Sequence, residues 1–148
     1  MEKEALKILL ADDDESDRLL FKDAFKELKL KLVIHTVNDG IQLMDYVTKN
    51  EDALPDVIFL DLNMPRKNGL ECLKEIRNNP KCKKIAVAIY STSASEHDIE
   101  ETFQNGANVF IKKPNDFKIL KKLLAKAVSS TYLYQHPPFN IERFLLSI

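Results

Sequence analysis

The sequence predicts an α/β fold in which helices cover both faces of a five-stranded parallel sheet. Short apolar runs alternate five times with segments whose apolar residues recur at helical spacing. That alternation is typical of repeated β-α-β units, which build parallel sheets. Four of the five apolar runs have no polar face, as strands buried on both sides require. The chain has 148 residues, enough for one domain with a substantial core.

The first two strand-helix pairs are expected within residues 6–49. LKILLA (6–11) is a short apolar run followed directly by acidic residues, as at the end of a buried strand. Residues 16–28 carry apolar side chains at helical spacing and predict the first helix. KLVIHTV (31–37) alternates polar and apolar residues, so we expect it at an edge of the sheet. The turn NDG (38–40) then leads into a second helix.

The third pair begins with another apolar run, DVIFLD (56–61), which ends in an aspartate. Apolar residues from Leu70 to Ile76 follow at helical spacing, and NNP (78–80) ends that helix. KIAVAIY (84–90) is apolar throughout and predicts the fourth strand.

The last part of the domain repeats the pattern. Ser95 or Glu96 begins a fourth helix, and NG (105–106) ends it. NVFIK (108–112) predicts the fifth strand. Residues 117–127 have apolar side chains at helical spacing and predict the fifth helix.

The composition argues against two classes of protein. With 22 basic and 23 acidic residues the net charge is -1, so there is no basic excess to attract nucleic-acid phosphates. No apolar run approaches the roughly 18 residues that a membrane helix needs, and the charged N-terminus does not resemble a signal peptide. We therefore expect a cytoplasmic protein that binds no nucleic acid and does not insert into a membrane. Cys72 and Cys82 fit neither a disulfide framework nor a metal cluster and are expected to be free thiols.

Polar side chains follow four of the expected strands at the point where each strand ends. They are Asp12 and Asp13 after the first strand, Asp61 after the third, Ser91 after the fourth and Lys113 after the fifth. Because the carboxyl ends of parallel strands meet at one edge of a sheet, we expect these side chains to converge. Each has a simpler explanation when taken alone. Acids near a helix start complement the helix dipole, and an isolated aspartate, serine or lysine is an ordinary cap, loop hydroxyl or solvated charge.

The residue types in this group favour phosphoryl chemistry. Carboxylates gathered within a few ångströms repel one another, and a shared cation relieves that repulsion. Mg²⁺ prefers oxygen ligands and commonly combines one or two carboxylates with phosphate oxygens. With a lysine nearby, the group predicts a place where a phosphoryl group is bound and transferred to an aspartate oxygen.

At these residues the sequence resembles the receiver domain of two-component response regulators. The matching features are the pair Asp12-Asp13, the segment DLNMPRKNG around Asp61, Ser91, and Lys113 followed by proline. The resemblance covers about residues 5–128. The segment PRKNG and the STS at 91–93 look most like single-domain regulators associated with phytochromes. The resemblance implies a doubly wound, flavodoxin-like sheet with strand order 2-1-3-4-5.

The resemblance also implies a role for each residue. Asp61 is the expected phosphoacceptor, which receives its phosphoryl group from a histidine kinase or a phosphotransfer protein. Asp12, Asp13 and Asp61 are expected to hold Mg²⁺ together with the backbone carbonyl of Asn63. The expected partners of the phosphoryl oxygens are Ser91 and Lys113, and the expected switch residues are Ser91 and Phe110.

The implied function is a phosphorylation-dependent relay through an unidentified downstream protein, not turnover of a substrate. Two alternatives are weighed against it. A Mg²⁺-dependent hydrolase would need a general acid or base near Asp61, and no histidine or second suitable carboxylate follows the third strand. A receiver-like module that is never phosphorylated would be expected to lose part of the acid and lysine set, which this chain retains.

Residues 1–128 are expected to form the receiver domain, and residues 129–148 an extension rich in apolar and aromatic side chains. The extension is too short to be an output domain. Left in water it would expose an apolar patch of the kind that marks an interface. We expect a helical extension that packs on its own domain or on a second copy. A homodimer could form through this extension or through the face of the fourth helix, fifth strand and fifth helix.

Overall fold

A five-stranded parallel sheet forms the centre of the computed structural model, which describes residues 5–129 and 141–147 and, for residues 142 and 143, the backbone alone. The strand order is β2-β1-β3-β4-β5, as the resemblance implied. The strands are β1 (Leu6–Ala11), β2 (Leu32–Val37), β3 (Val57–Leu60), β4 (Ala86–Ser91) and β5 (Val109–Lys112). The helices are α1 (Glu15–Leu28), α2 (Gly40–Lys49), α3 (Gly69–Asn78), α4 (Glu96–Gln104), α5 (Phe117–Ala127) and α7 (Ile141–Phe144), with a 3-10 turn at Pro80–Cys82.

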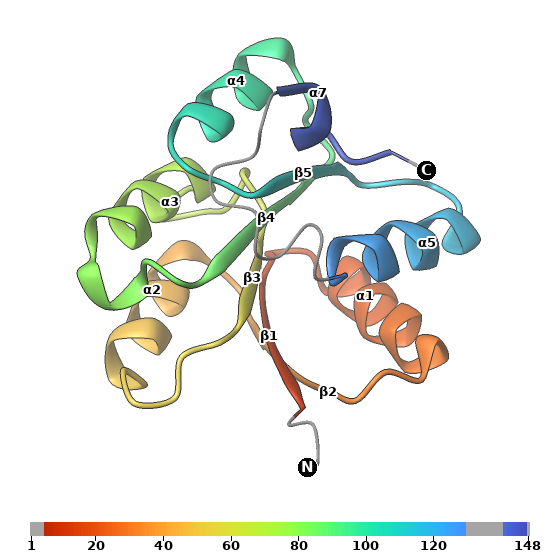
Figure 1. The fold of residues 1–148 in the computed structure, drawn as a ribbon, viewed down its shortest axis with the longest axis horizontal. Coiled ribbons are helices and arrows are strands. Elements are labelled where there is room, and N and C mark those ends of the chain that lie inside the picture. The colour runs from red at the N-terminus through yellow and green to blue at the C-terminus, as the bar shows by residue number, and fades with distance from the viewer. Residues whose placement is uncertain (1–4, 130–140, 148) are drawn as a thin grey trace.

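The helices lie in two layers on opposite faces of the sheet (Figure 1). Helices α1 and α5 lie side by side on one face, and α2, α3 and α4 cover the other. The α/β prediction is therefore confirmed. Strand β2 lies at an edge, where its alternating pattern had placed it, and its burial alternates over most of its length.

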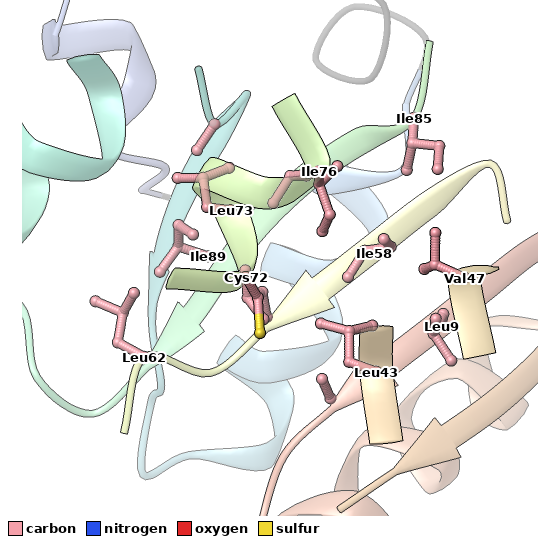
Figure 2. Packing of buried hydrophobic residues seen from close by; sticks show 14 of the residues in the cluster. Leu9, Leu43, Val47, Ile58, Leu62, Cys72, Leu73, Ile76, Ile85 and Ile89 are labelled. Atoms are coloured by element: carbon pink, nitrogen blue, oxygen red, sulfur yellow. The ribbon is translucent and has the colours of Figure 1, made fainter. Parts of the chain in front are cut away.

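Each face of the sheet has its own apolar core. Every residue of β3 and β4 is buried, because these central strands are covered on both sides. Figure 2 shows the larger cluster, in which side chains of α2 and α3 pack against the sheet. Cys72 and Cys82 are buried free thiols in this cluster. The opposite cluster contains Phe21 and Phe59, whose rings meet edge to face with centroids 5.0 Å apart.

The C-terminal segment lies along the outer edge of β5. The backbone N–H of Leu146 donates to the carbonyl oxygen of Phe110 at 2.9 Å. The ring of Phe144 is fully buried against Phe103 of α4 and Phe110 of β5. Helix α7 is a single turn, and the part of the predicted extension at residues 130–140 lies outside the described residues. Among the helices of the described ranges, none combines the length and the apolar character needed to cross a membrane.

Candidate functional site

The site begins with two aspartates that extend from neighbouring strands. Ala11 at the end of β1 pairs with Leu60 at the end of β3, so the next residues, Asp12 and Asp61, leave the sheet side by side. The Asp61 N–H donates to the Ala11 carbonyl at 3.0 Å, which continues the ladder by one step beyond β3. The parallel register therefore places both carboxyl groups at the same edge of the sheet, as the sequence predicts.

Three carboxyl groups meet at this edge. One oxygen from each of Asp12, Asp13 and Asp61 lies within 4.8 Å of the others. Asp12 is fully buried and the Asp61 side chain retains 6% of its exposure, whereas Asp13 is exposed. Two of the three carboxyl groups are thus buried, and the third is exposed to solvent.

Lys113 brings a positive charge to the same place. Its Nζ lies 2.7 Å from Asp12 Oδ2, 2.8 Å from Asp17 Oδ2 and 3.6 Å from Asp61 Oδ2, and its side chain is 8% exposed. The Lys113 N–H donates to the Ser91 carbonyl at 2.9 Å, which fixes where the side chain leaves β5. The neighbouring Lys112 is exposed, so Lys113 is the lysine that the fold directs into the site.

The electrostatics of the site follow from burial and from these charges. Burial raises the pKa of Asp61 to about 6; the charge of Lys113 opposes this shift, and the nearby Asp12 carboxylate adds to it. Burial also raises the pKa of Asp12, against a lowering effect of Lys113. Burial alone would lower the pKa of Lys113, but hydrogen bonds and charge contacts with the carboxylates raise it overall. The lysine is therefore charged at neutral pH.

The carboxyl groups fit a divalent cation. Asp12 Oδ2 is buried, and among the described residues it has no hydrogen-bond partner, although Lys113 lies at ion-pair distance. The contact between Lys113 and Asp12 is an ion pair, and it lowers the pKa of Asp12 against the effect of burial. An unsatisfied buried carboxylate oxygen beside two further carboxylates is a donor set suited to Mg²⁺.

The loop after Asp61 turns away sharply because α3 begins against the Asp61 backbone. The Gly69 N–H donates to the Leu62 carbonyl at 3.0 Å. The Asn63 N–H donates to Asp61 Oδ1 at 3.2 Å and so orients the carboxylate. Pro65 and Gly69 in this loop favour a turn that leaves the site open, but Asp61 is only 5% exposed, because Asp12 and Lys113 lie directly against it.

The other end of the loop is held by an ion pair that the sequence did not indicate. Arg66 has a left-handed backbone with a φ of 65°. Its Nε and Nη2 both donate to Asp39 Oδ2, at 3.0 and 2.7 Å. This contact fastens the loop to the N-terminus of α2, where Asp39 is the cap residue.

Ser91 and Phe110 lie just behind the site. Ser91 is fully buried at the end of β4, and its Oγ accepts a hydrogen bond from the Ser93 N–H at 3.2 Å. Phe110 is fully buried on the adjacent strand, where it pairs with Ile89. Tyr90 lies under Lys113, whose Nζ is 5.2 Å from the centre of the ring.

Asp17 is the charged residue of the site that the sequence reasoning missed. It lies in the first turn of α1, and its N–H donates to Asp14 Oδ1, which caps the helix. Its carboxylate accepts a hydrogen bond from Lys113 Nζ. A signal was present in the sequence, because Asp17 follows Asp13 by four residues at the start of a predicted helix, where a side chain reaches back toward the strand ends.

Comparison with known proteins defines the class. The family model of the response regulator receiver domain matches residues 8–125, so the chain belongs to this family of two-component signalling proteins.

Particular relatives support the assignment. The response regulator Rcp1 of Synechocystis sp. is 31% identical over 121 residues, which make up 79% of this chain and 82% of that protein. The structure of the phosphorylated cyanobacterial phytochrome response regulator RcpA is similar with a TM-score of 0.77 and 32% identity, over 90% of this chain and 99% of that one. The Mn²⁺-bound form of Rcp1 gives a TM-score of 0.76 and 29% identity over the same shares. The predicted resemblance to phytochrome-associated response regulators is confirmed.

Proposed function

We propose that this protein accepts a phosphoryl group on Asp61 from a histidine kinase or a phosphotransfer protein, in a Mg²⁺-dependent reaction. The observation that carries the proposal is the meeting of three carboxyl groups within 4.8 Å, with a lysine ammonium 3.6 Å from Asp61 Oδ2. The function is that of a signalling switch in the cytoplasm, with slow self-catalysed gain and loss of the phosphoryl group.

The transfer step is a displacement at phosphorus. An oxygen of the Asp61 carboxylate attacks the phosphorus of a phosphohistidine, the P–O bond forms as the P–N bond breaks, and the electron pair returns to the ring nitrogen. With its other nitrogen protonated, the ring leaves as neutral imidazole. Since the attacking group must be ionised, the raised pKa of about 6 still leaves Asp61 mostly a carboxylate at neutral pH.

The surrounding residues have complementary roles in this proposal. Asp12, Asp13 and Asp61, with the backbone carbonyl of Asn63, hold Mg²⁺, which screens the charge between the carboxylate and the incoming phosphoryl group. Lys113 neutralises a phosphoryl oxygen from the other side. Ser91 and Phe110 complete the proposed site. The Ser91 hydroxyl donates a hydrogen bond to a phosphoryl oxygen, and Phe110 responds to the movement of Ser91.

The proposed docking surface for the donor is the exposed side of α1. Leu19 and Leu20 are exposed on the helix whose first turn carries Asp17. Exposed leucines on the helix that supplies Asp17 to the site favour an apolar contact with the protein that delivers the phosphoryl group. Leu20→Glu should slow transfer from a phosphorylated histidine protein and leave the reaction with acetyl phosphate unchanged.

The proposed output surface is the face formed by α4, β5 and α5. This face binds a downstream protein or a second copy of the chain. In this proposal the receiver domain spans residues 1–128, and residues 129–148 are an extension that packs on its own domain or at a dimer interface. The contacts of Phe144 with Phe103 and Phe110 within one chain support packing of residues 141–147 on the chain's own α4 and β5. Light scattering compares the full chain with a chain ending at Ser130. A lower oligomeric state for the shorter chain supports the dimer, and no change in oligomeric state contradicts it.

The central experiment is modification by a small phosphodonor. Incubation with Mg²⁺ and acetyl phosphate should add the mass of one phosphoryl group to the wild-type protein and none to Asp61→Asn. The matched control is Asp56→Asn, since Asp56 precedes the same strand but lies at its opposite end, where its side chain binds the Lys7 N–H. Absence of any mass gain in the wild type overturns the proposal in favour of a module that is never phosphorylated.

A further inference from the structure

We propose that Asp17 is a positioning residue that holds the Lys113 ammonium away from Asp61 and keeps one of its N–H groups available for the phosphoryl group. This inference rests on the proposed function of the site. It assigns a role to a residue outside the acidic pair, the phosphoacceptor and the lysine.

The geometry around Lys113 Nζ carries the argument. The ammonium contacts Asp12 Oδ2 at 2.7 Å and Asp17 Oδ2 at 2.8 Å, whereas Asp61 Oδ2 is 3.6 Å away. A lysine ammonium has three N–H donors. Asp12 and Asp17 are the two carboxylates at 2.8 Å or less, which leaves one donor without a carboxylate at hydrogen-bond distance. The 3.6 Å separation exceeds the length of a charge-assisted hydrogen bond, so Lys113 forms an ion pair with Asp61 but no hydrogen bond.

Removal of the Asp17 carboxylate would take away one of the two close acceptors of the Lys113 ammonium. The Lys113 side chain is only 8% exposed, so the ammonium needs another acceptor. Apart from Asp12, which the ammonium already contacts, Asp61 is the nearest remaining carboxylate, and a movement of less than about 1 Å brings it to hydrogen-bond distance. Lys113 would then hydrogen-bond to the Asp61 carboxylate at Oδ2, and the weakened nucleophile should slow phosphorylation.

The placement of Asp17 is well defined by the fold. Asp14 caps α1 and binds the Asp17 N–H, which fixes the first turn of the helix. The Phe21 side chain, one helical turn further on, is fully buried in the core and anchors α1 against the sheet. The Asp17 side chain is 30% exposed, so its removal leaves no large cavity.

A simpler role for Asp17 is to complement the dipole of α1. Glu15 provides the comparison, because it is an acid in the same first turn, is exposed, and makes no ion pair or hydrogen bond with Lys113. A dipole effect would make the two acids equivalent. If Asp17 acts by positioning Lys113, substitution of Asp17 should affect phosphorylation and substitution of Glu15 should not.

The experiment has one readout without a phosphoryl group and one with it. The first is the ¹⁵N–¹H signal of the Lys113 ammonium in metal-free protein, assigned by its loss in Lys113→Met. The second is the rate of phosphorylation by acetyl phosphate and Mg²⁺. Both are measured for the wild type, Asp17→Ala, Asp17→Asn and Glu15→Gln, and the rate also for Lys113→Met with and without Asp17→Ala.

We expect Asp17→Ala to shift the Lys113 signal and to lower the rate about tenfold, the usual scale for a residue that orients a ligand of a reactive site. Asp17→Asn keeps an acceptor oxygen and should recover part of the rate, while Glu15→Gln should match the wild type in both readouts. In the Lys113→Met background Asp17→Ala should have no further effect, because a residue that acts through Lys113 has nothing left to position.

Three results would overturn the inference. They are an unchanged Lys113 signal in Asp17→Ala, an equal loss of rate in Glu15→Gln, and the same tenfold loss in the Lys113→Met background. If the wild type takes up a phosphoryl group and Asp17→Ala does so at the same rate, the inference fails and the proposed function stands. If the wild type takes up none, both fail. Should Asp17→Ala not fold, Asp17→Asn decides between these outcomes.

Discussion

Gly69 lies so close to Asp61 that a Cβ atom at position 69 would be 2.2 Å from the Asp61 carbonyl oxygen. No real Cβ makes such a contact, so α3 can begin at this point only because residue 69 has no side chain. The close approach couples the first turn of α3 to the backbone that presents the proposed phosphoacceptor.

Gly69→Ala should therefore displace Asp61 or the start of α3. Overpacking of this kind costs about 1–3 kcal/mol of stability, and the shift should slow phosphorylation by acetyl phosphate. Urea unfolding and the phosphorylation rate measure the two effects. Lys74→Ala, on the exposed side of the same helix, is the control and should change neither. A Gly69→Ala protein with wild-type stability and rate would contradict the coupling.

Asp61→Asn should raise the free energy of unfolding of the metal-free protein at about pH 7–8. Burial raises the pKa of Asp61 from its usual 3.8 to about 6, so between these values the folded protein binds more protons than the unfolded one. Stability consequently falls as the pH rises through this range. The loss of stability caused by the buried Asp61 charge is complete above the folded-state pKa and absent below the unfolded-state pKa. It amounts to at most about 3 kcal/mol.

Urea unfolding with a chelator, repeated from about pH 4 to pH 8, tests this pH dependence. Asp52→Asn is the control, because Asp52 is an exposed acid in the loop before β3. A gain for Asp61→Asn that is the same at both ends of the range would show that burial of charge is not its cause.

Mg²⁺ should stabilise the wild-type protein against thermal unfolding. A ligand that binds only the folded state adds about 2.7 kcal/mol at a concentration 100 times its Kd. Asp13→Asn removes one of the three carboxyl groups and should require more Mg²⁺ for the same increase in Tm. Asp23→Asn removes an exposed acid from α1 and should behave as the wild type. Identical Mg²⁺ titrations for Asp13→Asn and the wild type would argue against the assigned ligands.

Phe144→Ala should weaken the docking of the C-terminal segment on β5 and α4. The Phe144 ring is fully buried between Phe103 and Phe110, and loss of a buried phenylalanine costs up to about 3–5 kcal/mol. Leu145→Ala is the matched control, because Leu145 is exposed on the same segment and should change stability by less than about 0.5 kcal/mol. Equal effects of the two substitutions on the urea midpoint would contradict the observed packing.

Much of the fold was predictable because the spacing of apolar residues within each short segment indicates both its secondary structure and its burial. The fully apolar run around Val57 becomes a strand buried on both faces, and the alternating run around His35 becomes an edge strand. The residues just after the strands were equally accessible to reasoning, since parallel strands bring their carboxyl ends together. Asp12, Asp61 and Lys113 are accordingly found within contact distance.

What escaped prediction depends on contacts between distant segments. The bond from Lys113 to Asp17 joins residues 96 positions apart, and the pair of Arg66 and Asp39 is separated by 27. Neither pair has a periodic pattern, and Arg66 requires a left-handed backbone that its residue type does not suggest. The deep burial of Asp61 likewise results from side chains that pack around it after folding.

The position of Tyr90 has a practical consequence. The chain contains no tryptophan, so its near-ultraviolet emission comes from four tyrosines. One of them lies 5.2 Å beneath the Lys113 ammonium. Any displacement of that ammonium alters the electric field at the phenol ring. The intrinsic tyrosine fluorescence therefore reports movement of charge in the site without an added label.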